Sequence, residues 1–155
     1  MSTVVIGVIS DTHGLLRPEA LAALADSDYI IHAGDIGDPG ILDELNRVAP
    51  VTAVRGNVDQ LRWAARLQPT NTLEAGEVLL YVLHNLAELD LNPEAAGFSA
   101  VIYGHSHVPK QEMRNGVLYF NPGSAGPRRF RLPVTVGKLR LRAHAITAEI
   151  VNLAG

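Results

Sequence analysis

The chain has no cysteine among its 155 residues, and this absence excludes both disulfide bonds and thiolate ligands for a metal. Any bound metal would therefore be held by imidazole nitrogen, carboxylate oxygen or amide oxygen. Such ligands suit manganese, iron, nickel and zinc.

Two further signals are missing, a leader peptide and a membrane span. The apolar run at residues 4–9 has no basic segment or cleavage signature before it, and no apolar stretch approaches the roughly 20 residues that cross a bilayer. Internal repeats, low-complexity tracts and linkers are also missing. With 47% hydrophobic residues, we expect residues 1–155 to form a single domain in the cytoplasm, without membrane contact.

The net charge of −3 hides an asymmetry along the chain. Residues 1–100 carry five Lys or Arg against 14 Asp or Glu, whereas residues 101–155 carry eight against two. Six of those eight cations lie between Arg128 and Arg142, where they could attract phosphate esters or a nucleic-acid backbone. However, charges alternate with leucines at 138–142, so we favour a half-buried strand with a solvated outer face.

The first half alternates apolar runs with helical patterns. Strands are expected at 4–10, 29–33 and 51–55. Pro18 opens one predicted helix, and Asp38 with Pro39 supplies the N-cap and first turn of another. This βαβαβ order predicts parallel strands with ligands beyond their carboxyl ends.

The second half is expected to be more antiparallel. A hairpin broken by Gly76 is predicted at 73–83, a short helix at 91–96 and a strand at 100–103. Further strands are predicted at 111–114, 117–121, 134–142 and 145–153, with Asn115-Gly116 as a hairpin turn. The fold predicted from these elements is a mixed-sheet α/β sandwich.

Side chains able to bind a metal follow several of the predicted strands. There are seven: Asp11, His13, Asp35, Asn57, His84, His105 and His107. Taken singly, each has an ordinary explanation as a turn former, a helix cap or a loop histidine. Because strands that end at one sheet edge bring their following residues together, the set predicts one hydrolytic metal centre. A carboxylate such as Asp35 can bridge two cations about 3.5 to 4 Å apart.

These residues lie in motifs that resemble the calcineurin-like metallophosphoesterases, specifically the small single-domain bacterial and archaeal phosphodiesterases. The motifs occupy residues 9–14, 31–35, 54–59, 82–84, 103–109 and 121–124, and the resemblance extends over residues 4 to about 128. It implies an α/β sandwich with two divalent metal ions above the sheet. The expected enzyme is a phosphoric ester hydrolase, most simply a phosphodiesterase, acting on a small phosphate ester.

The family pattern also implies how the ligands divide. Asp11, His13, Asp35 and His107 would hold one metal, and Asp35, Asn57, His84 and His105 the other, with Asp35 as the bridge. Asp35, Asn57 and His84 are also assigned to catalysis, which would proceed by in-line attack of a metal-bridging hydroxide. Manganese is the first expectation for both metals, with iron, nickel or zinc as alternatives.

Two positions depart from the family pattern. Val58 stands where many members of the wider superfamily have a histidine that protonates the leaving group, a role worth roughly a hundredfold to ten-thousandfold in rate. We therefore expect dependence on the metals or a preference for activated leaving groups. Asn85 follows His84 where the family usually has glycine, which bears on the turn and leaves the ligand in place.

Neighbouring residues suggest supporting roles. Arg55 or Arg128 could reach a nonbridging phosphoryl oxygen. His32 is interpreted either as a residue that orients a ligand carboxylate or as a buried structural histidine. Asp59 could replace the missing acid, although a turn-capping role is preferred. Residues 121–124 are expected to form a structural turn near the site, and His144 is given no function.

Other functions remain as alternatives to a phosphodiesterase. One is phosphomonoesterase activity, and another is a non-catalytic protein-binding scaffold, because a eukaryotic trafficking subunit of this fold serves protein assembly. A nuclease is disfavoured, since such enzymes generally carry extra domains, so nucleic acid is an unlikely partner. A homo-oligomer is possible if Leu61, Trp63 and Leu67 form a contact or line a cleft, but ordinary packing is the default.

Overall fold

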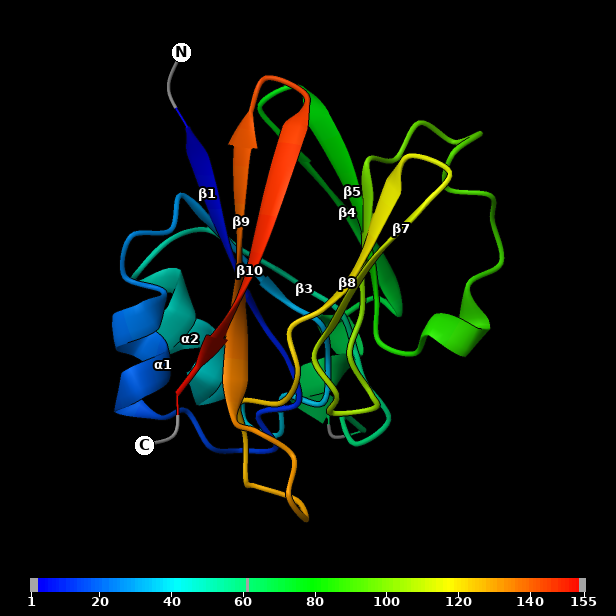
Figure 1. The fold of residues 1–155 in the computed structure, drawn as a ribbon. Helices are drawn as coiled ribbons and strands as arrows, with labels where there is room; N and C mark the ends of the chain where they lie inside the picture. Colours follow the sequence, from blue (N-terminus) through cyan, green and yellow to red (C-terminus); the bar gives the residue numbers. More distant parts are fainter. Residues whose placement is uncertain (1–2, 61, 154–155) are drawn as a thin grey trace.

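Two five-stranded mixed sheets pack face to face and form the body of the protein (Figure 1). The computed structural model describes residues 3–60 and 62–153. Strand order is β10-β9-β1-β2-β3 in the first sheet and β4-β5-β6-β8-β7 in the second. The predicted mixed-sheet α/β sandwich is confirmed.

The first sheet contains the βαβαβ unit expected from the sequence. Its elements are β1 (Val4–Ile9), α1 (Pro18–Ala23), β2 (Tyr29–His32), α2 (Pro39–Asn46) and β3 (Val51–Ala53), joined later by β9 (Thr135–Arg142) and β10 (Ala145–Asn152). The β1, β2 and β3 strands are parallel, so their carboxyl ends lie at one edge. Both helices begin at the predicted proline, and the Asp38 side chain caps α2 by accepting from the Gly40 N–H at 2.8 Å.

The second sheet is built from the middle of the chain. Its strands are β4 (Thr70–Ala75), β5 (Val78–Leu83), β6 (Ala100–Ile102), β7 (Lys110–Arg114) and β8 (Val117–Asn121). Hairpins β4/β5 and β7/β8 are antiparallel as predicted, as is the β9/β10 hairpin of the first sheet. Strand β6, however, runs parallel to both of its neighbours, β5 and β8.

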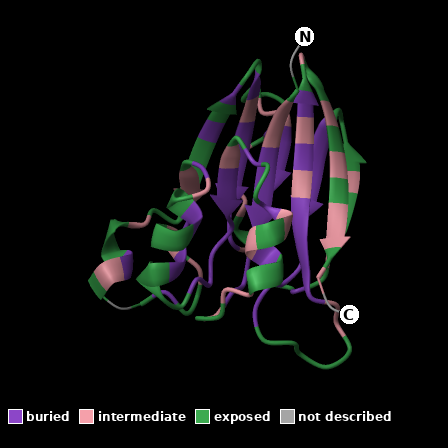
Figure 2. Ribbon diagram, turned by 90° about the vertical axis from the view of Figure 1, so that its left-hand side faces the viewer, coloured by how far each residue is buried: buried purple, intermediate pink, exposed green. Residues whose placement is uncertain are grey.

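The main hydrophobic core lies between the two sheets. Strand side chains that point inward alternate with outward ones, which follows from the two-residue repeat of a strand. Among the described residues, Ile6, Ile31, Leu80, Phe120 and Leu139 are fully buried in this core. Figure 2 shows buried residues concentrated on the strands, with exposed residues on the outer sides of the helices. Burial of each large side chain contributes about 1.5–3 kcal/mol, before the entropic cost of ordering it.

Each sheet also has a covered outer face. Helices α1 and α2 pack on the first sheet through Leu24, Ile41 and Leu45, in a cluster that also receives Trp63 and Leu67. Ordinary packing is thus confirmed for Trp63 and Leu67, whereas Leu61 lies outside the described residues. On the second sheet, apolar residues between 86 and 98 cover Tyr81, Tyr103 and Tyr119 and their neighbours.

The covering segment on the second sheet is where the predicted elements fail. The helix expected at 91–96 is wrong: residues 93–97 form turns, which begin at Pro93 and end at Gly97. The helical turn of this segment is instead η2 (Leu86–Glu88). A second 3₁₀ helix, η1 (Arg62–Arg66), follows β3 and was not predicted. Within the described residues, none of the helices is both long and apolar enough to cross a membrane.

The cations that alternate with leucines at 138–142 lie on a half-buried strand, as the sequence predicts. In β9, Leu139 and Leu141 point into the core, whereas Arg140 pairs with Glu149 at 2.9 Å and Lys138 pairs with Asp26 at 2.9 Å. These cations are held by surface carboxylates across neighbouring elements.

Candidate metal centre

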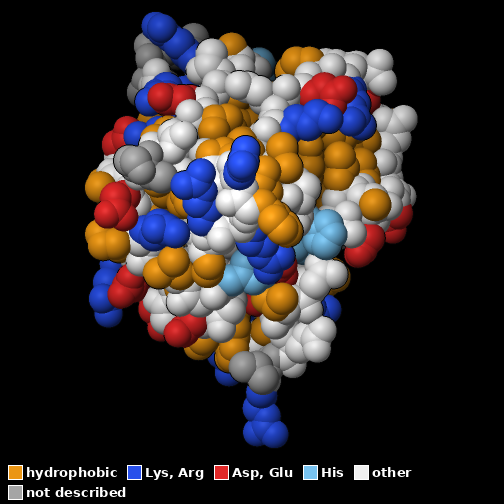
Figure 3. Space-filling view, turned by 60° about the horizontal axis from the view of Figure 1, so that its bottom comes forward, with side chains coloured by type: hydrophobic (Ala, Val, Ile, Leu, Met, Phe, Trp, Pro, Cys, Tyr) orange, Lys and Arg blue, Asp and Glu red, His pale blue; other side chains and the backbone are white. Residues whose placement is uncertain are grey.

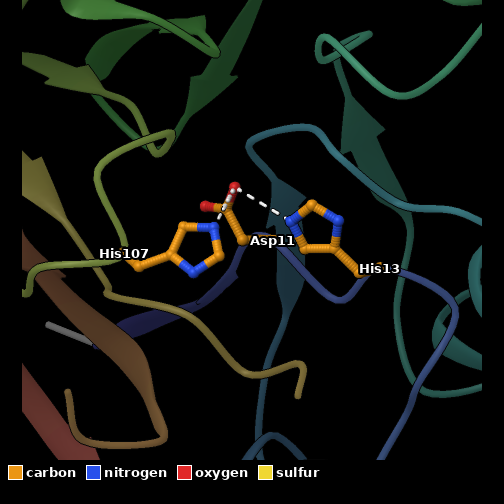
Figure 4. A group of neighbouring side chains, drawn as sticks. All are labelled: Asp11, His13 and His107. Carbon is orange, nitrogen blue, oxygen red and sulfur yellow. Dashed lines mark ion pairs between the residues drawn. The ribbon is translucent and has the colours of Figure 1, made fainter. Parts of the chain in front are cut away.

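Asp11, His13 and His107 form a compact group at the edge where β1 ends (Figure 4). Asp11 Oδ1 lies 3.9 Å from His13 Nε2 and 3.4 Å from His107 Nε2, so the carboxylate stands between two imidazoles. Asp11 and His13 come from the loop after β1, and His107 comes from the loop after β6. Residues 94 or more positions apart in the chain thus share one site.

A second group shares the Asp11 carboxylate. Asp11, Asp35 and His84 each present a ligand atom within 4.8 Å of the others. His84 Nε2 lies 3.1 Å from Asp35 Oδ2 and 3.8 Å from Asp11 Oδ1, and His13 Nε2 lies 3.6 Å from Asp35 Oδ2. The loops after β1, β2, β5 and β6 therefore deliver five of the seven predicted ligands to one cluster.

The two remaining predicted ligands lie next to this cluster. The His105 ring is edge-on to the His84 ring, with centroids 5.3 Å apart. Asn57 follows Gly56 and lines a cavity together with His84. Both residues are thus placed on the His84 side of the cluster, which is the side that the family pattern assigns to the second metal.

The ligand loops have an unusual backbone. Five of the seven predicted ligands have positive φ: 56° at Asp11, 46° at His13, 57° at Asp35, 73° at His105 and 65° at His107. This left-handed conformation is disfavoured for L-residues, although Asp and His enter it more often than most. Such a concentration of strained residues marks a site whose geometry the surrounding structure holds in place.

Two glycines let the ligand loops approach each other closely. A Cβ at Gly56 would overlap the Asp35 backbone N and Oδ1, and a Cβ at Gly104 would overlap Ser10 Oγ. Both glycines directly precede a predicted ligand, Asn57 and His105. The glycine at these positions is therefore required by packing between loops and explains part of the sequence motif.

Hydrogen bonds fix the His84 ring for metal binding. Its Nδ1 lies 2.7 Å from the Ala33 carbonyl, which can only accept, so Nδ1 carries a proton and Nε2 faces the carboxylates. Burial disfavours a charged ring, but Asp35, Asp11 and the Ala33 carbonyl outweigh it and raise the pKa of His84, so a bound cation would take the place of a proton at Nε2. His84 Nε2, His13 Nε2 and Asp11 Oδ1 are buried without a hydrogen-bond partner. Acceptor atoms that face one another in a buried cluster are costly unless a cation lies between them. The residues present thus fit a divalent cation.

Charge and burial shift the two carboxylates in opposite directions. Burial raises the pKa of Asp11 to about 6, despite hydrogen bonds from Ser10 Oγ and the His105 N–H. Burial also raises the pKa of Asp35, but His84, the Val58 N–H and His13 outweigh it and lower the pKa to about 2. Asp35 is therefore ionised throughout the neutral range, and Asp11 gains most from a nearby cation.

His13 and His107 are held in their neutral, metal-binding form. Burial, followed by the charge of Arg129, lowers the pKa of His107 to about 4. Burial also lowers the pKa of His13, where Arg129 acts in the same direction against the attraction of Asp35. Figure 3 shows Lys and Arg side chains gathered beside histidines on this face. The cation that lowers the pKa of these two histidines is Arg129. Its neighbour Arg128 is the residue that the sequence suggested for phosphate binding.

His32 supports the loops and does not orient a ligand carboxylate. It is fully buried; its Nδ1 accepts from the Gly34 N–H at 3.1 Å, so Nε2 carries the proton and donates to Thr12 Oγ1 at 3.0 Å. Thr12 Oγ1 in turn donates to the Ile36 carbonyl at 2.8 Å. The structural reading of His32 is correct, because it ties the loop after β1 to the loop after β2.

Asp59 is a capping residue, as preferred, and cannot serve as the missing acid. Its carboxylate is 1% exposed and accepts from the N–H groups of Ile36, Gly37 and Gly56 at 3.0–3.1 Å. Both carboxylate oxygens are therefore engaged by backbone donors within the turn. The general-acid hypothesis for Asp59 is therefore dropped.

Further supports surround the cluster. The expected turn at 121–124 is present: Asn121 Nδ2 donates to the Gly104 carbonyl and Ser124 Oγ donates to the Asp11 carbonyl. Asn85 needs no glycine conformation, because its extended backbone (φ −112°) and its side chain cap η2. Sequence reasoning missed Ser10, which donates to Asp11 Oδ2 at 2.7 Å, although its place beside Asp11 in the motif was a signal.

A cavity of about 400 Å³ adjoins the cluster on the side of His84 and Asn57. Its lining includes Arg55 on one wall and Glu88 with Asp90 on the segment that covers the second sheet. Arg55 was a predicted site residue, but the two carboxylates were not. They belong to no metal-ligand motif and reach the site only through the packing of residues 86–91.

An α/β sandwich that gathers buried carboxylates and imidazoles at the ends of its strands is the arrangement of a metal-binding domain. Comparison with known proteins makes the class specific. The family model described as "Calcineurin-like phosphoesterase superfamily domain" matches residues 4–144. The chain belongs to this superfamily of metallophosphoesterases, whose members bind divalent metals.

Relatives in bacteria and archaea carry related names. A probable metallophosphoesterase of Methanocaldococcus jannaschii is 36% identical over 135 residues, which are 79% of this chain and 68% of that protein. Phosphodiesterase YfcE of Escherichia coli K12 is 29% identical over 160 residues, 84% of each chain. The crystal structure of Entamoeba histolytica Vps29 complexed with zinc has a TM-score of 0.74 at 18% identity, covering 97% of this chain and all of that one, and so shares the fold.

Proposed function

We propose that the protein is a dinuclear metal-dependent phosphodiesterase. The observation that carries this proposal is the set of buried polar atoms that face one another without a hydrogen-bond partner: Asp11 Oδ1, His13 Nε2 and His84 Nε2. Two divalent cations there would supply a nucleophile at neutral pH and neutralise charge on the phosphoryl oxygens. The name of the YfcE relative supports a diester over a monoester.

The protein residues divide the remaining tasks. Asp35, ionised and placed between His13 and His84, is the proposed bridging ligand. We assign Asp11, His13 and His107 to one metal, and His84, Asn57 and His105 to the other. Manganese is the metal we propose first, because oxygen and imidazole ligands suit it; iron, nickel and zinc share that preference.

Substrate binding is assigned to the two arginines near the cluster. Arg129 acts on the His13 and His107 side, and Arg55 lines the cavity on the His84 side. A guanidinium on either side can donate two hydrogen bonds to nonbridging phosphoryl oxygens. Val58 is 48% exposed and offers only its N–H, to Asp35 Oδ1 at 3.0 Å, so we propose a preference for activated leaving groups.

The test is hydrolysis of bis(p-nitrophenyl) phosphate by protein stripped with chelator and reloaded with manganese. Asp35→Asn keeps the shape and tolerates the left-handed backbone but removes the charge, so it should lower kcat by a factor on the order of a thousand or more. Metal content, measured by elemental analysis, should fall below two per chain in this variant. Asp43→Asn, an exposed change on α2, should leave both values unchanged.

Reloaded protein that binds fewer than two metals, or that hydrolyses neither this diester nor p-nitrophenyl phosphate, would overturn the proposal. Faster turnover of the monoester would change the proposed activity to that of a phosphomonoesterase. A protein that binds metal without turnover would instead favour a scaffold role, since a Vps29 of this fold is known in complex with zinc. A cytoplasmic location and a homo-oligomeric state stay predictions.

A further inference from the structure

The cavity beside the metal centre is lined in part by two of the candidate ligands. His84 is 4% exposed, its Nε2 has no hydrogen-bond partner, and the residue lines the cavity together with Asn57. A volume of about 400 Å³ falls within the range of small-ligand sites, which is roughly 300–1,000 Å³. One substituent of an ester bound at the metals therefore has room to enter it.

The ionisable groups of the cavity wall carry a net negative charge. Glu88 and Asp90 outnumber Arg55, and both carboxylates are exposed. On the other side of the cluster, the positive charge of Arg129 acts on His13 and His107. The two sides of the metal centre thus carry charges of opposite sign. An ester that spans the centre has negative side chains near one end and a positive side chain near the other.

We propose that this cavity binds one arm of the phosphate ester and selects an arm with a positive charge, such as a trimethylammonium group. The inference rests on the proposed function, because it takes the phosphoryl group to lie at the metal cluster. Glu88 and Asp90 attract the cationic arm, and they repel an arm with a further phosphate or carboxylate. The substrate class is accordingly a zwitterionic phosphodiester.

Binding provides a test that does not depend on turnover. Phosphocholine and its uncharged isostere 3,3-dimethylbutyl phosphate differ only in the charge of the arm, and calorimetry in the presence of manganese measures their Kd. We expect phosphocholine to bind at least fivefold more tightly at low ionic strength. This preference should shrink in 0.5 M salt, because exposed charges are screened.

The double variant Glu88→Gln/Asp90→Asn should lose the preference while it keeps the affinity for the uncharged isostere. A matched control, Glu77→Gln/Glu94→Gln, removes two exposed carboxylates that do not line this cavity and should retain the preference. Equal affinities in the wild type, or a preference that survives in the Glu88/Asp90 variant, would overturn the inference.

Turnover separates this inference from the function on which it rests. The p-nitrophenyl diesters of choline and of 3,3-dimethylbutanol should differ at least fivefold in kcat/KM, and the double variant should equalise them. If neither diester is hydrolysed while phosphocholine still binds preferentially, the catalytic proposal fails and the cavity assignment stands. If both are hydrolysed at equal rates and bind equally, the catalytic proposal stands and the cavity assignment fails.

Discussion

Single hydrogen bonds decide the chemistry of several residues in this site. The Ala33 carbonyl fixes the proton of His84 on Nδ1, and the Gly34 N–H fixes the proton of His32 on Nε2. The same residue type thereby has two roles. His84 turns its Nε2 toward the carboxylates, where a proton or a metal can bind, whereas both ring nitrogens of His32 form hydrogen bonds that hold the loops together.

His32 gives a prediction for stability against pH. Burial lowers its pKa from 6.5 to about 3, so the unfolded state binds more protons between these values. Stability supplied by neutral His32 is complete above pH 6.5 and falls by up to about 1.4 kcal/mol per pH unit below it. In His32→Gln, which lacks the titrating group, the free energy of unfolding should be lower at pH 7.5, and its gap to the wild type should narrow toward pH 4.5.

Urea unfolding of chelator-treated protein at pH 7.5, 6.0, 5.0 and 4.5 measures this gap. The chelator removes the effect of metals on the other histidines, and taking the difference between variants cancels groups that both proteins share. A gap that stays constant across this range would show that His32 is not held neutral in the folded protein.

At the scale of single residues, the sequence predicts which side chains act as metal ligands, but it does not predict which residues surround them. Asp11, His13, Asp35, His84 and His107 converge as their strand-end positions predicted. Glu88, Asp90 and Arg129 carry no motif, because their position depends on how a covering segment and a loop pack. Likewise, the tautomer of a histidine depends on which backbone group lies beside it, and this is set only by the folded chain.

At the scale of elements, the site depends on how closely neighbouring loops approach. The loop after β3 passes so near Asp35 that Gly56 has no room for a side chain. The parallel order of β1, β2 and β3 follows from their apolar runs and intervening helices, which is why it could be predicted. The failed helix at 91–96 was a short, weak pattern with Pro93 and Gly97, and its apolar residues cover the second sheet without helical structure.

Gly56→Ala tests this close approach. The added methyl group would displace Asp35 or its own loop, and misplacement by about 1 Å can lower catalysis about a hundredfold. We expect kcat for an activated diester to fall by that order and the metal affinity to weaken, as followed by titration with manganese.

Gly40→Ala is the matched control for this change. Its Cβ in α2 would meet only the Asp38 side chain, at 3.3 Å, so activity should persist. If Gly56→Ala retains wild-type activity and metal affinity, the loops are not held as tightly as the structure indicates.

At the scale of the whole molecule, both sheets contribute to one site. The loops after β1 and β2 of the first sheet carry Asp11, His13 and Asp35, while the loops after β5 and β6 of the second carry His84, His105 and His107. The shared core between the sheets supports our proposal that residues 1–155 act as one domain. A cation bound between the sheets would therefore link them directly.

This link predicts that metal stabilises the entire fold. A cation at a hundred times its Kd adds about 2.7 kcal/mol to the folded state, which corresponds to an increase of roughly 5–10 °C in Tm for a chain of this size. Calorimetry with manganese against chelator should show this increase. Asp35→Asn should lose most of it, and an unchanged Tm for wild-type protein would contradict a metal held by both sheets.

The positive φ angles at Asp11, His13, Asp35, His105 and His107 have a consequence for how this fold can change. Each costs on the order of 1–2 kcal/mol relative to a relaxed backbone, within a total stability of about 5–15 kcal/mol for a typical domain. Glycine at any of the five would relieve the backbone and delete a ligand in one step. In the metal-free protein, greater stability and loss of a ligand therefore lie in the same direction, so the stabilisation that bound metal adds is what opposes the drift of this fold toward a plain scaffold.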